Sequence, residues 1–206
     1  MSYAEQLQRA IALLEEGAYP EALPVFASCL EQAQEDPAPL WGYGLCLEQL
    51  GRYEEAVAVY ERLLDSEGLE ARFRAVLLNN LGLCQARLGR WEQARRCFEA
   101  ALPDDPTAQS GRNLAMALVE LGAYQEGIEQ LVRTLRAHPH DVPTALVMAG
   151  YLEEVGAWKR AASYYAWVRD LLRQKDPEHP DLSWVTERAE KLGVREESVF
   201  PNGGAA

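Results

Sequence analysis

Gly51-Arg52-Tyr53-Glu54-Glu55-Ala56 is one of five copies of a short motif, in which a glycine is followed by an aromatic residue two positions later and a small residue three positions after that. The copies begin at Gly17, Gly51, Gly89, Gly122 and Gly156, which stand 34, 38, 33 and 34 residues apart. Their aromatic residues are Tyr19, Tyr53, Trp91, Tyr124 and Trp158, and their small residues are Ala22, Ala56, Ala94, Gly127 and Ala161. A fixed period in the range of roughly 20 to 50 residues predicts a protein built from stacked, repeated units.

Other positions repeat in step with this motif. A large residue follows nine positions after each glycine, and a small residue precedes each glycine by seven positions. The large residues are Phe26, Tyr60, Phe98, Leu131 and Tyr165, and the small ones are Ala10, Gly44, Gly82, Ala115 and Ala149. Pro106 and Pro139 end the third and fourth copies. Together these residues closely resemble the tetratricopeptide repeat, a helix-turn-helix unit of about 34 residues.

The resemblance implies an all-α fold, a right-handed α-solenoid of about five helix-turn-helix repeats. The repeats are expected at residues 3–36, 37–70, 75–107, 108–141 and 142–175. A stripe made of Leu182, Val185, Ala189 and Leu192 predicts one more amphipathic helix at residues 181–192, which would cap the array. We expect a single domain over residues 1–193 and a flexible tail over residues 194–206, because the tail lacks a helical period.

Elementary sterics assign roles to the repeated small residues. Two helices approach closely only where both lack bulk, so Gly44 and Gly82 are expected to face Ala56 and Ala94 across their helix pairs. Each signature glycine is expected to end a first helix in the left-handed conformation. The spacing of 38 residues between the second and third glycines predicts an insertion, and therefore a longer connector, near residues 65–70.

Composition narrows the classes of function. The chain has 206 residues, 48% of them hydrophobic, and a formal net charge of -12. The acidic balance disfavours nucleic acid as a partner, because such binding depends on neutralising phosphates. No stretch is long and apolar enough to insert into a membrane, and no leader pattern opens the chain, so we predict a cytoplasmic protein. Cys29, Cys46 and Cys84 stand at small core positions and are expected to be reduced thiols.

Residues typical of catalysis or metal binding are scarce. The cluster His138-Pro139-His140-Asp141 is the best candidate for a metal site, but it falls on a predicted connector and the sequence suggests no third ligand. Paired acids such as Glu54-Glu55 are typical of solvated helix ends. We therefore expect no enzyme, no catalytic residue, no metal and no cofactor.

The first helices of the repeats are expected to line a concave groove. In register, this candidate groove includes Leu7, Ile11, Trp41, Leu45, Asn79, Asn80, Leu83, Gln109, Arg112, Asn113, Met116 and Leu146. The groove is predominantly apolar, which favours an amphipathic helix or a hydrophobic peptide as its ligand.

The resemblance also implies a known mode of peptide binding, in which a C-terminal carboxylate is held by successive first helices, with lysine and asparagine on the first of them, asparagine on the second, and lysine and arginine on the third. Leu7, Ile11 and Val76 occupy positions that this mode requires to be polar or basic, so the pattern fails here. A polar island remains, made of Asn79, Asn80, Gln109, Arg112 and Asn113. Asn80 and Asn113 align with a structural asparagine of the repeat, which leaves Asn79 and Arg112 as the better candidates for contacting a ligand.

Two functional hypotheses follow from these observations. The first is a non-catalytic scaffold or adaptor that binds a peptide or amphipathic helix of a protein partner in its groove. The alternative is a self-assembling structural protein. Residues 3–36 hold seven acids and one base, whereas residues 71–98 hold six arginines and one acid, so two copies could meet head to tail. Insertion of the tail around Val199, Phe200 and Pro201 into a neighbour's groove is a second route to self-assembly.

Overall fold

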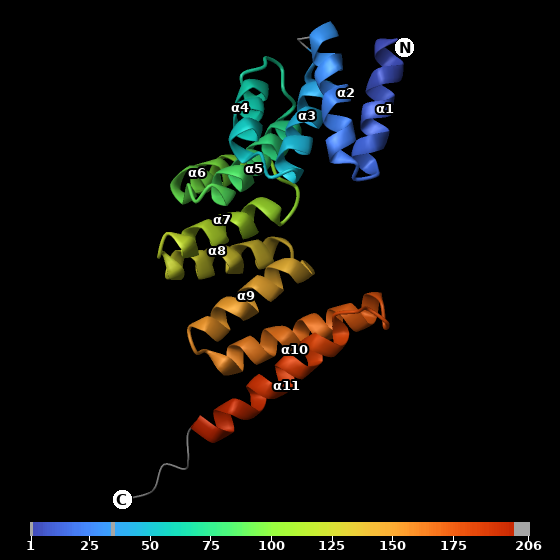
Figure 1. Ribbon diagram of the computed structural model, residues 1–206. Coiled ribbons are helices and arrows are strands. Elements are labelled where there is room, and N and C mark those ends of the chain that lie inside the picture. The colour runs from blue at the N-terminus through green and yellow to red at the C-terminus, as the bar shows by residue number, and fades with distance from the viewer. Residues whose placement is uncertain (1, 34–35, 200–206) are drawn as a thin grey trace, which may run out of the picture. The chain divides into compact units, whose positions relative to one another are not determined.

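The computed structural model describes residues 2–33 and 36–199, with side chains described as far as residue 193. Over these residues the chain forms eleven α-helices and no strand (Figure 1). The helices are α1 (Tyr3–Glu15), α2 (Tyr19–Gln32), α3 (Pro37–Gln49), α4 (Tyr53–Leu64), α5 (Ala71–Arg87), α6 (Trp91–Ala101), α7 (Gln109–Glu120), α8 (Tyr124–Ala137), α9 (Val142–Glu154), α10 (Trp158–Lys175) and α11 (Leu182–Val199). The predicted all-α, helix-turn-helix architecture is confirmed. None of the described helices is long and apolar enough to cross a membrane.

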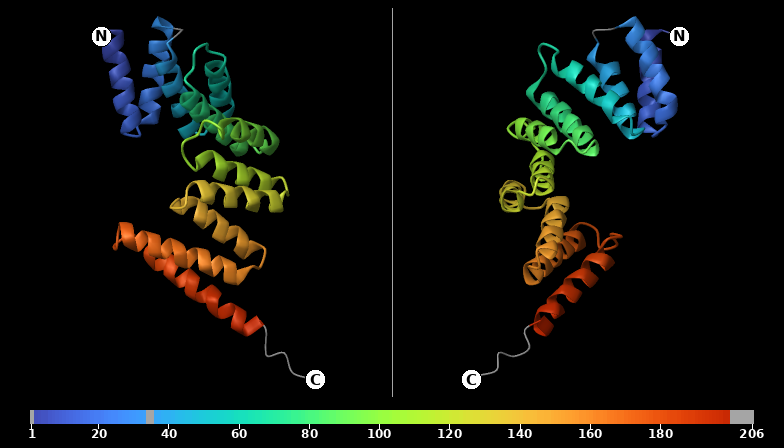
Figure 2. Two further views of the ribbon diagram at one scale, coloured as in Figure 1. Left: turned by 180° about the vertical axis from the view of Figure 1, so that it is seen from behind. Right: turned by 60° about the vertical axis from the view of Figure 1, so that its left-hand side comes forward.

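The helices group into two compact units. Unit 1 is Met1–Gly122 and contains α1 to α7, and unit 2 is Ala123–Ala206 and contains α8 to α11. Within unit 1 each helix packs against the next, and α1 also contacts α3 and α5 also contacts α7. Within unit 2, α10 and α11 lie side by side, as the two views of Figure 2 show. The division falls inside the expected fourth repeat, between its two helices, and the single domain over residues 1–193 stays a prediction.

The signature glycines end the first helices as expected. Gly17, Gly51, Gly89, Gly122 and Gly156 all have φ between 71° and 81°, a left-handed conformation that other residues adopt with strain. At Gly51 the turn closes with two backbone hydrogen bonds, from Gly51 N–H to the Glu48 carbonyl at 3.0 Å and from Arg52 N–H to the Leu47 carbonyl at 2.8 Å. This pair of bonds satisfies two carbonyls that would otherwise be left open at the helix end.

The glycines inside the first helices make room for aromatic rings, not for the alanines that we expected opposite them. A Cβ atom on Gly44 would lie 2.9 Å from Cε1 of Tyr60, and one on Gly82 would lie 2.5 Å from Cε1 of Phe98. The expected partners Ala56 and Ala94 are fully buried, but they are not the atoms that crowd these glycines. Each ring reaches further than an alanine methyl, so the ring sets how closely the two helices approach.

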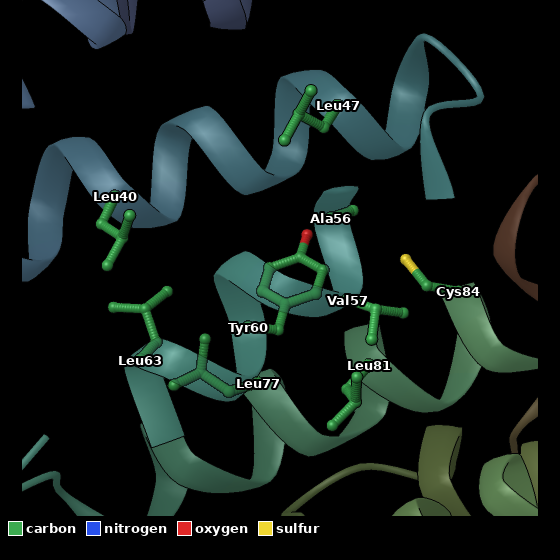
Figure 3. Close-up of a cluster of buried hydrophobic side chains, with 9 residues drawn as sticks. All are labelled: Leu40, Leu47, Ala56, Val57, Tyr60, Leu63, Leu77, Leu81 and Cys84. Carbon is green, nitrogen blue, oxygen red and sulfur yellow. The ribbon is translucent and has the colours of Figure 1, made fainter. Parts of the chain in front are cut away.

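A hydrophobic core joins α3, α4 and α5 (Figure 3). It consists of Leu40, Leu47, Ala56, Val57, Tyr60, Leu63, Leu77, Leu81 and Cys84. Burial raises the pKa of Cys84 to about 12 and that of Cys46, in the neighbouring core of α1 to α3, to about 11. Both thiols therefore stay protonated near neutral pH and act as small core residues, as their sequence positions indicate.

Two segments differ from their expected lengths. The connector at residues 65–70 is long, as predicted, but the insertion also extends α5, which begins at Ala71 instead of near residue 75. The last helix, α11, continues to Val199 and does not end at Leu192. Residues 194–199, expected in the tail, are therefore helical, whereas Phe200 and Pro201 lie outside the described residues.

Candidate functional site

The residues predicted for the groove lie on first helices of both units. Eleven of the twelve belong to α1, α3, α5 and α7 of unit 1, whereas Leu146 belongs to α9 of unit 2. The exposed large apolar side chains on these helices are Ile11 (40%), Val76 (43%) and Met116 (41%). Leu7, Leu45 and Leu83 are half-buried. The first helices of unit 1 therefore carry exposed apolar side chains, and the groove itself stays a prediction.

Trp41 lies at the edge of the core, against α5. Its ring meets the ring of Phe73 edge to face, with 5.5 Å between centroids and an interplanar angle of 85°. Its Nε1 is buried and has no hydrogen-bond partner among the described residues. Phe73 lies in the part of α5 that precedes the expected start of the third repeat, so the longer helix supplies a packing partner for Trp41.

Two asparagines of the predicted polar island are buried between α5 and α7. Asn79 donates from Nδ2 to Oγ of Ser110 at 2.9 Å, and it accepts at Oδ1 a hydrogen bond from Nδ2 of Asn113 at 3.0 Å. All three side chains are buried. Because a buried amide must be satisfied, this network holds α5 to α7 and leaves Asn79 little surface for a ligand.

Asn80 takes part in a second network, between α3, α4 and α5. Tyr60 donates its hydroxyl to Oε2 of Glu48 at 2.9 Å, and Asn80 hydrogen-bonds to the same hydroxyl. Burial raises the pKa of Glu48, while the hydrogen bond from Tyr60 and the charge of Arg87 oppose this rise.

Gln109, by contrast, is exposed at the start of α7, and Arg112 is half-buried one turn further along.

A pocket of about 350 Å³ opens where α5, α6 and α7 meet, entirely within unit 1. We call it the α5–α7 pocket; its lining residues are Leu83, Ala86, Arg87, Trp91, Phe98, Asn113 and Met116. Three of them, Leu83, Asn113 and Met116, were predicted for the groove. Sequence reasoning missed Ala86, Arg87, Trp91 and Phe98, because it followed one face of the first helices and read Trp91 and Phe98 as packing residues of the repeat.

The lining is apolar except for one amide and one cation. Phe98 forms the floor, since it is almost fully buried, and Arg87 is exposed at the C-terminal end of α5. None of the described residues that line the pocket carries a carboxylate, thiol, hydroxyl or imidazole. No group of three or more metal-binding side chains gathers anywhere in the described part of the chain. The arrangement is suited to binding an apolar group beside a negative charge.

Comparisons with known proteins address the fold. A tetratricopeptide repeat family model matches residues 13–79, and a second one matches residues 75–107. No curated protein sequence matches the chain.

Solved structures resemble nearly the whole chain at low sequence identity. The structure of MamA residues 41–end from Desulfovibrio magneticus RS-1 is 21% identical, with a TM-score of 0.72, and the match covers 85% of this chain and 98% of that one. PilF from Pseudomonas aeruginosa is 18% identical, with a TM-score of 0.67 over 98% of this chain and 93% of that one. YrrB is 16% identical, with a TM-score of 0.64 over 96% and 92%. At these identities the likeness extends to the fold alone.

Proposed function

The chain belongs to the tetratricopeptide repeat family, and on that premise we propose that it is an adaptor that binds a segment of a partner protein in the α5–α7 pocket. Proteins of this fold generally serve as non-catalytic scaffolds for protein interactions, and the proposal gives this chain no catalytic role. The proposed setting is the cytoplasm, where the cysteine thiols would stay reduced.

The observation that carries the proposal is the combination of an apolar pocket with exposed apolar side chains on two of the helices that line it. Met116 lines the pocket and is 41% exposed, and Val76, on the same helix as Leu83, is 43% exposed. Large apolar side chains that remain accessible around a cavity are typical of a binding surface. An amphipathic helix or a hydrophobic peptide would bury them by inserting one large side chain into the pocket. The structure of YrrB is described as having an unusual peptide-binding site, which is consistent with this use of the fold.

The test is a selection of peptides from a displayed library on the full chain, followed by affinity measurements on two variants. Met116→Lys places a charge in the pocket, and Leu121→Lys places the same charge at the end of the same helix, outside the pocket lining. The two side chains are almost equally exposed, at 41% and 42%, so both substitutions should leave the fold intact. Circular dichroism checks that expectation.

We expect the selected peptides to bind the Met116→Lys variant at least about tenfold more weakly and the Leu121→Lys variant unchanged, because an unpaired charge in an apolar pocket is costly. Peptides whose affinity is insensitive to Met116→Lys would place the binding site elsewhere and overturn the proposal.

Self-assembly through opposite charges is the competing hypothesis, and the ion pairs of unit 1 count against it. Arg95 is paired with Glu92 and Glu99, and Arg96 is also paired with Glu92. Arg90 lies 3.9 Å from Glu54. Much of the basic charge of residues 71–98 is therefore already matched within the protein. Light scattering across protein and salt concentrations tests this hypothesis, which predicts an oligomer that dissociates as salt is added.

A further inference from the structure

The surroundings of Arg87 carry an inference about the chemistry of the partner. We propose that the bound segment carries a carboxylate next to its apolar anchor, and that Arg87 pairs with this carboxylate at the rim of the α5–α7 pocket. This inference rests on the proposed function, because it assumes that the pocket is the binding site. It specifies a negative charge on the partner segment and names Arg87 as the residue that recognises this charge.

Arg87 is the charged residue of the pocket lining, and no ion pair within the described residues engages it. Its positive charge opposes the rise in the pKa of Glu48 that burial causes. Glu48 accepts a hydrogen bond from the hydroxyl of Tyr60, and among the described residues no salt bridge joins its carboxylate to Arg87. The guanidinium of Arg87 therefore keeps its donors available at the mouth of the pocket.

In unit 2, the glutamate at the position equivalent to Glu48 is paired with an arginine. Glu153 stands three residues before its signature glycine, as Glu48 does, and it accepts a hydrogen bond from Tyr165. There the carboxylate also receives two donors of Arg188, with Nε 3.0 Å from Oε2 and Nη2 on Oε1. Such a two-pronged contact uses the planar fork of the guanidinium. In unit 1 no comparable contact closes on Arg87, which leaves its fork for a carboxylate of the partner.

The local surroundings favour a negative partner in an otherwise acidic protein. The chain carries a net charge of -12, and of the six arginines in residues 71–98, Arg90, Arg95 and Arg96 are paired with glutamates, whereas Arg87 is in no ion pair among the described residues. Apolar walls formed by Leu83, Trp91 and Met116 exclude water beside Arg87 once a side chain fills the pocket. An ion pair is stronger where water is excluded. On a helical ligand, an acid three or four residues from the apolar anchor lies on the same face and reaches the rim.

A charge-swap selection tests the inference. The displayed library is selected in parallel on the wild-type chain, on Arg87→Glu, and on Arg96→Glu as a control. Arg96→Glu makes the same change in net charge on an exposed residue of α6 that is not part of the pocket lining. Synthetic peptides from the wild-type selection are then remade with the acid replaced by Gln or Lys and measured by fluorescence anisotropy.

We expect wild-type and Arg96→Glu selections to enrich an acid beside a large apolar residue, and the Arg87→Glu selection to enrich Lys or Arg at that position. The acid-to-Gln peptide should bind the wild type about tenfold more weakly, the loss of one charge-assisted contact. Peptides that depend on Met116 but show no charge preference would overturn this inference and leave the proposed function standing. Peptides that ignore Met116 altogether would overturn both.

Discussion

Single glycines set the distance between helices in this protein because an aromatic ring from a neighbouring helix occupies the space of their missing side chains. The tightest case is Gly42 of α3, where a Cβ atom would lie 2.3 Å from Cζ of Phe26 in α2. Gly150 of α9 is the opposite case, since a Cβ atom there would meet no atom of the described chain within contact distance. Gly42 is thus required by the packing of α2 against α3, whereas packing does not require a glycine at Gly150.

Replacing each of these glycines by alanine should have opposite effects. Gly42→Ala should lower the free energy of unfolding by about 1–3 kcal/mol, because the methyl group would force Phe26 out of a fully packed core. Gly150→Ala should raise it by about 0.5–1 kcal/mol, because alanine is the better helix former and the space is open. Urea unfolding followed by circular dichroism measures both. A Gly42→Ala variant as stable as the wild type would show that α2 and α3 can separate without cost.

Residue-level prediction from sequence succeeded where a role repeats in every unit. The five signature glycines were predictable because each needs the same backbone conformation at the same place. Gly42 was not, because its partner Phe26 belongs to the preceding repeat and the other repeats do not carry glycine there. Arg87 was missed for a similar reason, since a pocket depends on three helices and a periodic pattern describes one at a time.

Among the elements, α11 differs most from its prediction. The sequence predicted a helix over residues 181–192, but Gly193 is not among the glycines with positive φ, and the helix continues to Val199. The five glycines that do end helices are each followed two positions later by an aromatic residue, whereas Gly193 is followed by Arg195. A glycine alone is therefore a weak stop signal, and the residues after it decide whether the helix ends.

The attachment of α11 to α10 and α9 should depend on Arg188. This residue pairs with Glu153, which is 16% exposed, and Trp184 meets Tyr165 edge to face at 5.6 Å. Arg188→Ala should lower the free energy of unfolding by about 1–2 kcal/mol and speed hydrogen exchange in α11, because it leaves a mostly buried carboxylate without its cation.

Lys191→Ala is the matched control for that substitution. Lys191 lies on the same helix and pairs with Glu187, but both side chains are more than half exposed, so the loss should stay below about 0.5 kcal/mol. Equal effects of the two substitutions would mean that Arg188 contributes no more than a surface charge.

The contact between α3, α4 and α5 should become less stable as pH rises, because burial raises the pKa of Glu48 above the ordinary value of 4.5. Between these two pKa values the folded protein binds more protons than the unfolded chain, so the free energy of unfolding falls as pH increases through the interval. Glu48→Gln removes this term while keeping an acceptor for Tyr60. The variant should be more stable than the wild type at neutral pH, and the difference should shrink at acidic pH. Urea titrations at several pH values measure it, and a difference that does not change with pH would contradict the assignment.

At the scale of the whole molecule, the repeat period predicted the helices, and it carries no signal for the two compact units. The repeat period reflects the residues that each helix needs for packing against its neighbours in the array. The motif at Gly122 has the same residue types as the other four copies. The boundary between Gly122 and Ala123 passes through that copy of the motif. Most of the fold was thus predictable from sequence, whereas the candidate site was predictable only in part, because it depends on which first helices remain accessible within unit 1.

A fragment of residues 1–122 should fold alone and retain the α5–α7 pocket. All seven lining residues and the Asn79–Ser110–Asn113 network lie within unit 1. The expected result is a cooperative thermal transition and an affinity for the selected peptides equal to that of the full chain. Calorimetry and fluorescence anisotropy measure the two properties. A folded fragment that no longer binds would show that unit 2 contributes to recognition.

The tyrosine–glutamate pairs of α3–α4 and α9–α10 restrict how the repeats can be exchanged. Tyr60 and Tyr165 each direct a hydroxyl to a glutamate twelve residues earlier, whereas the repeats with Phe26, Phe98 and Leu131 have Leu14, Ala86 and Val119 at that earlier position. Placing α4 after α5 would bury a phenol against Ala86 with no acceptor. The unit that can be exchanged between repeats of this protein is consequently the whole helix pair. A chimaera joined at a signature glycine would combine a first and a second helix whose residues at these two positions do not match.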